Sequence, residues 1–423
     1  MSASVPSPRR AIGRARLGVG VTALLAAAAL TLAACSNGGS GDGAQGSGNG
    51  TGTAANLGGA TDDGSSAPAI PVSIRANVRT GKPVKVDTTV TVKASGGTLQ
   101  AVALRPAGGK RLPGTLAADG TSWQAGRLLD PGTSYVLTAK PADGGAAWTR
   151  RFRTQDLTLA QQTYASIAPL SGQTVGVGMP VIVHFDVPVT NKASIEKHLS
   201  VTSTPAQKGS WHWFSDTEVH WRPKRYWKAG STVTVHADVK SIPAGNGIYG
   251  QSDRTATFKV GDKHIYRVNM ATDQMKVYSN DKLLRTIPVT TGQPGFITRS
   301  GIKVIIEKDE KHTMNSETIG IPKGDPNYYN MKDVQWAMRM TYSGEFIHAA
   351  PWSVASQGHA NVSHGCTGMS TANADWLFHM TQIGDVVDEY GTDRPMEVTN
   401  GYGDWNMSWA DYQKGSALYS AKG

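Results

Sequence analysis

The strongest constraint on the fold is a period-two alternation of apolar and polar residues that recurs between residues 69 and 261. Val84 and Val86, for example, alternate with Lys85 and Asp87. This alternation is typical of strands that bury one face. Glycine-rich turn signals separate the alternating segments at short intervals. We therefore expect short strands packed into β-sandwiches.

The alternation falls into two blocks, residues 69–156 and residues 157–261. A weak internal repeat relates them, since residues 132–139 parallel residues 230–237, and a strand with a single phenylalanine follows each. We predict two related sandwiches that resemble Ig-like domains without an inter-sheet disulfide. Four tryptophans crowd the second block, and we expect them to pack in a core more often than to stack on sugars: Trp211, Trp213, Trp221 and Trp227.

The N-terminus has the pattern of an export signal. Four arginines precede the apolar run 17–34, and small residues lead into Cys35. Residues 1–34 are therefore predicted to be a signal peptide, and Cys35 in its setting resembles a lipidated bacterial cysteine. An uncleaved anchor is the alternative, because the run is just long enough to span a membrane. Residues 35–68 are rich in glycine, serine and alanine and should form a flexible tether.

The charge of the chain is mildly basic. The formal net charge is +10, and removal of the signal peptide with its four arginines leaves +6. Such a protein is drawn to anionic surfaces such as wall polymers or phospholipid headgroups. No Lys/Arg cluster interleaved with aromatic residues follows the signal, so we do not expect a nucleic-acid partner.

The chemistry concentrates between residues 348 and 369. Cys366 is the only cysteine besides Cys35, and His348, His359 and His364 precede it. A thiol needs a base to become a nucleophile, and a neighbouring glycine frees backbone N–H groups to hold an oxyanion. A buried structural cysteine is the alternative. A zinc site is a weaker one, since no HExxH or CxxC spacing accompanies these residues, and we expect neither metal nor cofactor.

The segment Ser363-His364-Gly365-Cys366, preceded by His348, resembles the active-site signature of the L,D-transpeptidases. The layout resembles actinobacterial lipoprotein members, which carry Ig-like domains ahead of the catalytic domain. The resemblance implies a mainly β protein in which two Ig-like sandwiches precede a YkuD-like catalytic domain at residues 262–391. It also implies that residues 392–423 form a short C-terminal subdomain packed on the catalytic domain.

The resemblance also suggests roles for individual residues. Cys366 is the expected nucleophile and His348 the expected base, with the backbone carbonyl of Ala349 holding the imidazole. His364 is expected to shape the site, and Gly365 to form an oxyanion hole together with the N–H of Cys366.

Further residues are expected around the substrate. Trp352 and Ser363 should line the pocket. Residues 319–332 look like a long mobile loop, which in the family is a flap, so that Tyr328 and Tyr329 become candidate lid residues. The family commonly has Asn where this chain has Gly368. After the cysteine, residues 371–381 have helical spacing, with Thr371 as the expected cap.

The implied function is an acyltransferase that forms 3→3 peptidoglycan cross-links. Cys366 would take an acyl group from a tetrapeptide donor stem, release D-Ala, and pass the acyl group to the side-chain amine of a diamino acid. The alternatives are an L,D-carboxypeptidase, attachment of a protein to the wall, and a non-catalytic wall-binding lipoprotein. The resemblance further implies carbapenem β-lactams as covalent inhibitors and an extracytoplasmic location, anchored to the membrane through the lipid on Cys35 and reaching into the cell wall.

Overall fold

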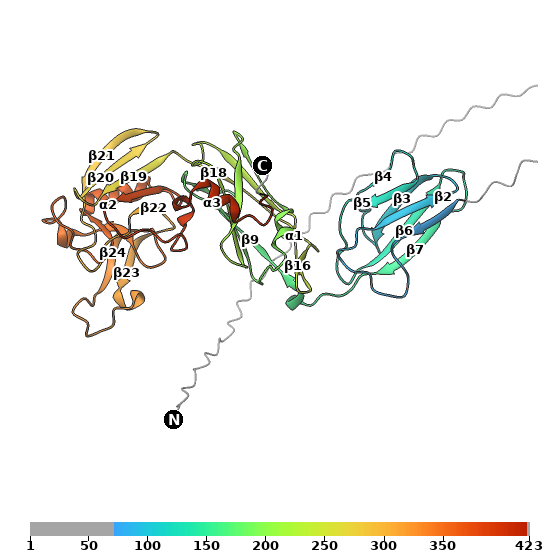
Figure 1. Ribbon diagram of the computed structural model, residues 1–423, viewed down its shortest axis with the longest axis horizontal. Coiled ribbons are helices and arrows are strands. Elements are labelled where there is room, and N and C mark those ends of the chain that lie inside the picture. The colour runs from blue at the N-terminus through green and yellow to red at the C-terminus, as the bar shows by residue number, and fades with distance from the viewer. Residues whose placement is uncertain (1–71, 421–423) are drawn as a thin grey trace, which may run out of the picture. The chain divides into compact units, whose positions relative to one another are not determined.

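The computed structural model describes residues 72–420 (Figure 1). Within that range the protein is mainly β, which confirms the predicted fold class. The predicted signal peptide, the tether and Cys35 lie outside the described residues. No helix in the described range is long and apolar enough to cross a membrane.

The first sandwich closes a core between two sheets. One has the order β1-β2-β5-β4 and the other the order β3-β6-β7. In β6 the side chains of Tyr135, Leu137 and Ala139 are buried while their neighbours are more exposed, as period-two patterning requires. The strands are β1 (Ser73–Ala76), β2 (Thr91–Ser95), β3 (Leu99–Pro106), β4 (Gly114–Leu116), β5 (Ser122–Ala125), β6 (Ser134–Pro141) and β7 (Trp148–Arg153).

The second sandwich packs two four-stranded sheets, in the orders β10-β18-β15-β12 and β13-β14-β11-β9. A small sheet, β16-β17-β8, and two short helices complete it. Its elements are η1 (Leu159–Gln161), β8 (Gln162–Thr163), β9 (Ala165–Ala168), β10 (Thr174–Val175), β11 (Val181–Phe185), α1 (Lys192–Glu196), β12 (Leu199–Thr204), β13 (Gly209–Trp213), β14 (Glu218–Pro223), β15 (Thr232–Ala237), β16 (Pro243–Gly245), β17 (Ile248–Gly250) and β18 (Arg254–Val260).

The four tryptophans of this sandwich belong to its core. Trp211, Trp213, Trp221 and Trp227 are all buried among the aliphatic side chains of both sheets. Trp227 also donates its indole N–H to the Met179 carbonyl at 2.7 Å. Their burial fits the expectation of core packing and leaves their ring faces covered.

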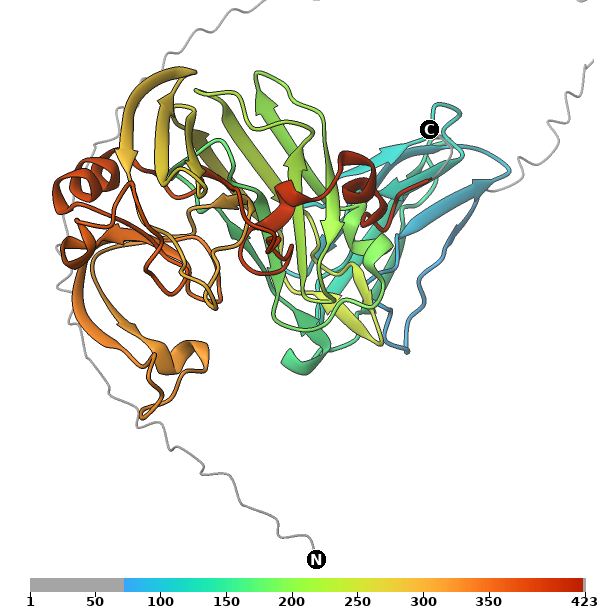
Figure 2. The same cartoon turned by 60° about the vertical axis from the view of Figure 1, so that its left-hand side comes forward.

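The third region contains two sheets around a shared core, with α2 beside them (Figure 2). The five-stranded sheet has the order β21-β20-β19-β27-β22, and the four-stranded sheet the order β23-β24-β25-β26. The elements are β19 (His264–Asn269), β20 (Gln274–Ser279), β21 (Lys282–Pro288), β22 (Gly301–Val304), β23 (Glu307–Asn315), η2 (Ser316–Ile319), β24 (Asn330–Arg339), β25 (Phe346–Ala349), η3 (Pro351–Ser353), β26 (Thr367–Met369), α2 (Thr371–Met380) and β27 (Val386–Tyr390).

Two local predictions for this region need correction. The cap of α2 is Ser370, whose side chain accepts from Asn373 N–H, and Thr371 is the first helical residue. The loop expected at residues 319–332 is shorter, because β24 begins at Asn330 and pairs with β23 as a hairpin.

The C-terminal segment contacts both the third region and the second sandwich. It consists of η4 (Gly403–Asn406) and α3 (Trp409–Lys414). The Asn406 side chain accepts from Ile302 N–H and donates to the Ile302 carbonyl of β22. α3 packs on β13, and Figures 1 and 2 both show it against the strands of the second sandwich. The C-terminal segment was expected to pack on the third region alone, but it packs on the second sandwich as well.

A buried ion pair joins this segment to the second sandwich. His220 on β14 lies 3.0 Å from Asp404 and 3.1 Å from Glu218. Burial alone would lower the pKa of His220, but the charge of Asp404 and the hydrogen bonds to both carboxylates raise it to about 9. The imidazolium therefore persists at neutral pH.

This pair predicts a pH-dependent stability. Because the folded-state pKa of His220 is raised, its contribution is fully present below the ordinary pKa of 6.5 and is lost as pH rises through about 9. The expected loss is about 3 kcal/mol over that window. Urea unfolding at a series of pH values should show this loss of stability in the parent protein, and His220→Gln should show a loss smaller by about that amount. An equal slope in both proteins would contradict the assignment.

Candidate active site

The parallel pairing of β25 with β26 brings the two central residues of the site together. His348 lies in β25 directly opposite Gly368 of β26, and Cys366 immediately precedes β26. The chain between these strands loops out and returns beside its starting point. Residues 18 positions apart in the sequence therefore become close neighbours.

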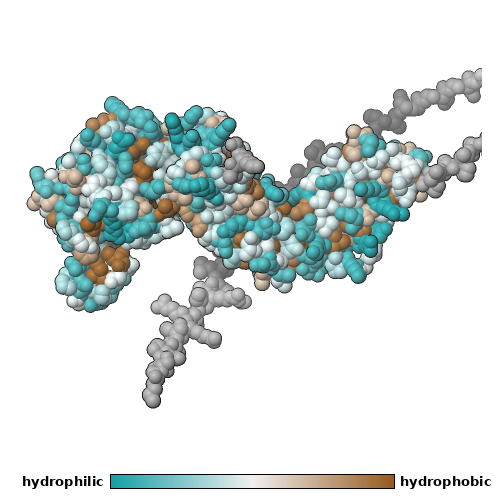
Figure 3. Space-filling view, viewed as in Figure 1, coloured by the Kyte–Doolittle hydropathy of each residue, from teal (hydrophilic) through white to brown (hydrophobic). Residues whose placement is uncertain are grey.

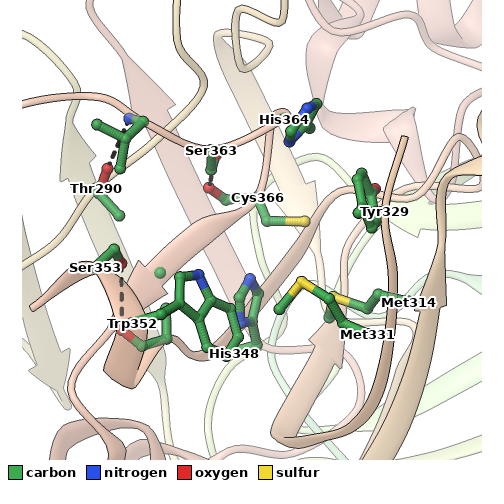
Figure 4. Close-up of a pocket in the computed structure, with 13 residues that line it drawn as sticks. Thr290, Met314, Tyr329, Met331, His348, Trp352, Ser353, Ser363, His364 and Cys366 are labelled. Carbon is green, nitrogen blue, oxygen red and sulfur yellow. Dashed lines mark hydrogen bonds between the residues drawn. The ribbon is translucent and has the colours of Figure 1, made fainter. Parts of the chain in front are cut away.

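The thiol and the imidazole share one cavity of about 190 Å³. Figure 4 shows the Cys366 sulfur pointing into it, with His348 and Tyr329 on either side. Figure 3 shows hydrophobic surface gathered where the β23–β24 hairpin meets the body of this region. The lining residues are Thr290, Met314, Tyr329, Met331, His348, Ala350, Trp352, Ser353, Val362, Ser363, His364, Cys366 and Gly368.

The surroundings of Cys366 favour the protonated thiol. Its side chain is buried, with the residue only 8% exposed, and Sγ donates to the Gly344 carbonyl at 3.6 Å. Burial raises the pKa of the Cys366 thiol to about 12, although the backbone of Phe346 opposes the rise by hydrogen bonding to the sulfur. Ionisation at neutral pH thus requires a base that takes the proton as the thiol reacts.

His348 is placed and protonated as such a base would be. Its Nδ1 lies 2.8 Å from the Ala349 carbonyl oxygen, which can only accept, so Nδ1 carries the hydrogen and Nε2 is left as the acceptor. Burial lowers the pKa of His348 below its ordinary value, with the bond to Ala349 opposing this. The ring of Trp352 stacks on the imidazole of His348, with the two ring centroids 5.8 Å apart, and covers one of its faces.

The turn before Cys366 is held by Ser363. Its hydroxyl donates to the Cys366 carbonyl at 2.7 Å and accepts from Gly365 N–H at 3.1 Å. Gly365 has φ +118°, a conformation that residues with a side chain rarely adopt. Since Gly365 N–H is already bonded to Ser363, the expected role of Gly365 in an oxyanion hole requires that bond to be exchanged when substrate binds.

His364 lies in the wall of the cavity. Its ring packs between the rings of Phe296 and Tyr329, whose centroids lie 4.6 Å and 4.9 Å from that of His364. Burial lowers the pKa of His364. The neutral ring therefore completes an aromatic wall, which fits the expectation that His364 shapes the site.

Of the two candidate lid tyrosines, only Tyr329 contacts the cavity. Tyr329 lines the cavity, and burial raises its pKa to about 12, while Tyr328 is absent from the lining. Met314 and Met331, which the sequence did not single out, lie on the same hairpin and line the cavity. Their flexible thioether side chains make this wall of the cavity adaptable in shape.

Gly368 is packed closely against the side chains of Ala350 and Thr290. A Cβ built at this position would lie 2.9 Å from the Ala350 Cβ and 3.2 Å from the Thr290 Cγ2. The strand therefore sits too near its neighbours to admit a side chain without movement. The departure from the family's Asn is matched by the local packing.

A charge network that sequence reasoning missed lies beneath the site. Lys303 is fully buried, and its Nζ donates to Glu345 at 2.6 Å and also to Glu389. Arg299 donates to the other oxygen of Glu345 at 3.0 Å. Burial alone would lower the pKa of Lys303, but Glu389 and Glu345 raise it, so Lys303 is charged.

The network reaches Cys366 through its neighbour in the chain. Thr367, which follows Cys366, donates its hydroxyl to Glu389 at 2.6 Å. Glu345 in turn follows Gly344, whose carbonyl accepts from the Cys366 thiol. Both backbone segments that hold the sulfur are thus fixed to the same buried ions.

The remaining histidine of the segment contributes little. His359 is exposed and does not line the cavity. Within residues 72–420 no group of three or more His, Cys, Asp or Glu side chains gathers as metal ligands would.

Comparison with known proteins gives two family matches. Residues 81–243 match a bacterial Ig domain, and residues 263–388 match an L,D-transpeptidase catalytic domain. The chain is 34% identical to L,D-transpeptidase 2 of Mycobacterium tuberculosis over 79% of this chain and 82% of that protein. It is 32% identical to L,D-transpeptidase 5 of the same species over 78% of this chain and 73% of that protein.

A solved structure of an L,D-transpeptidase in complex with imipenem is also similar. It is 34% identical, covers 53% of this chain and 98% of that chain, and has a TM-score of 0.48.

Proposed function

This chain belongs to the L,D-transpeptidase family, and we propose that it forms 3→3 peptidoglycan cross-links through an acyl-enzyme on Cys366. The observation that best supports this is the pairing of a thiol and a neutral imidazole in one cavity, with Nδ1 of His348 fixed by the Ala349 carbonyl. That arrangement leaves one basic nitrogen for the thiol proton.

In the first half-reaction, Sγ of Cys366 attacks the carbonyl carbon of the third residue of a tetrapeptide stem. Nε2 of His348 accepts the thiol proton as the C–S bond forms. The C–N bond to the terminal D-Ala then breaks, and His348 returns the proton to the leaving amine. The product is a thioester on Cys366, free D-Ala and a neutral His348.

In the second half-reaction, the side-chain amine of a diamino acid on another stem attacks the thioester. His348 accepts a proton from that amine, the C–S bond breaks, and the proton passes to the departing sulfur. One amide has replaced another, so the exchange uses no ATP.

The proposal is tested by product analysis with the full-length protein in detergent. Incubation with a disaccharide-tetrapeptide should give a cross-linked dimer lacking one D-Ala, and Cys366→Ala should give none. Release of D-Ala without a dimer would indicate water or another acceptor instead. No reaction by the folded parent protein would leave a wall-binding protein as the better account.

The pH dependence of acylation follows from the two pKa shifts. Because the pKa of His348 is lowered and the base acts when neutral, the acid limb of the rate profile should lie below pH 6.5. Because the pKa of the Cys366 thiol is about 12, the acylation rate should not rise near pH 9.0, where an ordinary thiol ionises. Stopped-flow acylation by a chromogenic β-lactam measures both. A rate that climbs through pH 9 would indicate a free thiolate.

We also propose that carbapenems acylate this enzyme by opening their lactam ring on Cys366. Intact mass after incubation with imipenem should show one adduct in the parent protein and none in Cys366→Ala. An adduct that survives this substitution would refute the assignment.

The location is a separate part of the proposal. A lipid on Cys35 would hold the enzyme on the outer face of the membrane, with the residues that follow reaching towards the wall. Mass analysis of the N-terminal peptide from cells should find an acylated Cys35. Cys35→Ala should release the protein from the membrane fraction, and its retention there would contradict lipid anchoring.

A further inference from the structure

The excess positive charge of the protein is concentrated in one domain. Residues 72–156, which include the whole first sandwich, contain 13 Lys and Arg against five Asp, a net charge of +8 out of +10 for the chain. Residues 157–423 contain 25 basic and 24 acidic residues and are close to neutral. An asymmetry of this size marks the first sandwich as the part that attracts anions.

On the first sheet, two of these charges face each other. Arg75 of β1 lies directly opposite Lys93 of β2, and both side chains are exposed. Directly opposite positions of antiparallel strands bring Cβ atoms to within about 5.5 Å, where like charges destabilise the pair. The placement costs stability unless an anion from outside offsets it.

The second sheet repeats the arrangement on the other side of the core. Arg105 of β3 and Arg151 of β7 flank Val136 of β6 in one cross-strand row, and both are exposed. Lys140 lies further along the same face of β6. Each sheet of the sandwich therefore presents an outer basic row.

Carboxylates of the protein do not neutralise these rows. Among the basic residues of 72–156, only Arg127 and Arg153 form ion pairs, with Asp253 and Asp156 respectively. Asp130 is already paired with Lys240 of the second sandwich. The described acidic groups thus leave Arg75, Lys93, Arg105 and Arg151 available to an external anion.

Beside one of the rows lies an open hollow of about 450 Å³ on the outer face of β2, β4 and β5. Hydroxyl and amide side chains line it next to Lys93 and can exchange hydrogen bonds with sugar hydroxyls. The polar members of the lining are Thr91, Lys93, Thr115, Ser122 and Gln124.

We propose that the first sandwich domain binds a flexible anionic polymer whose repeating units carry hydroxyl groups together with phosphate or carboxylate groups. A flexible polymer can reach the basic rows on both sheets, whereas a flat membrane would meet one face at a time. No large hydrophobic side chain of residues 72–156 is exposed for insertion into a bilayer. Binding would hold the catalytic domain within an anionic wall without engaging the cavity at Cys366.

The test measures binding of the full-length protein to poly(glycerol phosphate) by calorimetry at low and high salt. Affinity should fall steeply with salt because exposed charges are screened within about 10 Å at 0.1 M. The combined variant Arg75→Thr, Lys93→Thr, Arg105→Thr and Arg151→Thr should bind about tenfold more weakly or worse. The matched control removes four exposed lysines elsewhere, Lys197, Lys259, Lys276 and Lys282, each replaced by Thr, and should bind as the parent does.

Three results would overturn the proposal. One is an equal loss in the control variant, which would indicate overall charge alone. A second is binding to vesicles of equimolar phosphatidylcholine and phosphatidylglycerol without binding to the polymer, which would indicate a membrane surface. The third is tighter binding to single-stranded DNA than to the polymer. Acyl transfer to a soluble stem peptide should be unchanged in both variants, so failure here is distinct from failure of the proposed function.

Discussion

Replacement of His348 by alanine is expected to lower the rate constant for acylation of Cys366 by about 10²- to 10⁴-fold, the range that a positioned general base contributes. The thiol has a pKa of about 12 and cannot supply a useful fraction of thiolate at neutral pH. With Nε2 of His348 removed, the remaining histidine of the cavity, His364, faces an aromatic wall. Acylation by a donor stem followed by intact mass gives the rate constant.

His364→Ala is the matched control, since it removes an imidazole from the same cavity. Its effect on acylation should be much smaller than that of His348→Ala. Circular dichroism and thermal unfolding should show that both variants fold. The assignment of the base fails if the two variants lose the same activity, or if His364→Ala loses more.

The second large effect is on stability. Lys303→Met should lower the free energy of unfolding of the catalytic region by about 3–5 kcal/mol, because it leaves Glu345 and Glu389 buried without their shared cation. The resulting strain is carried to Thr367 and so to the backbone of Cys366. Acylation should therefore slow as well, although Lys303 touches no substrate.

Hydrogen–deuterium exchange of peptides from β22 and β27, measured across urea concentrations, reports this stability locally. Lys276→Met, which removes an exposed lysine from β20, should leave exchange unchanged. Adding Glu389→Gln to Lys303→Met should restore part of the loss, because it removes one of the unpaired charges. A loss of less than about 1 kcal/mol in Lys303→Met would mean that Glu345 and Glu389 do not depend on Lys303 for their stability in the core.

Much of the fold was predictable because it rests on local patterns. The alternation of Val181, Val183 and Phe185 places all three in the core, since a strand buries every second side chain. The helix after Cys366 was also predicted, although its cap is Ser370 instead of Thr371. The loop before β24 was overestimated because Asn330, a residue type common in loops, is the first residue of the strand.

The two central residues of the site could also be predicted from the sequence, for a related reason. Cys366 and His348 come from one short stretch of sequence, and a parallel strand pair returns the chain on itself. Ser363, His364 and Trp352 lie in or beside the same loop and line the same cavity, and Tyr329 joins them from the hairpin.

The rest of the site depends on contacts between distant segments. Met314 and Met331 enter the cavity from a hairpin that precedes it in the chain, and nothing in their local sequence separates them from ordinary strand residues. Lys303 is the single charge of β22, and Glu389 lies beside Asp388 in β27, so local patterning assigns both to a solvated face. Their burial depends on the pairing of β22 with β27, two strands that lie far apart in the sequence.

The most direct test of the account is the site of the acyl-enzyme. Full-length protein would be incubated with a disaccharide-tetrapeptide donor in the absence of an acceptor, quenched in acid, and mapped by peptide mass spectrometry. The account predicts a thioester of the stem, lacking its terminal D-Ala, on the peptide that contains Cys366, and no such species in Cys366→Ala. A stem attached to any other residue, or release of D-Ala by Cys366→Ala, would contradict it.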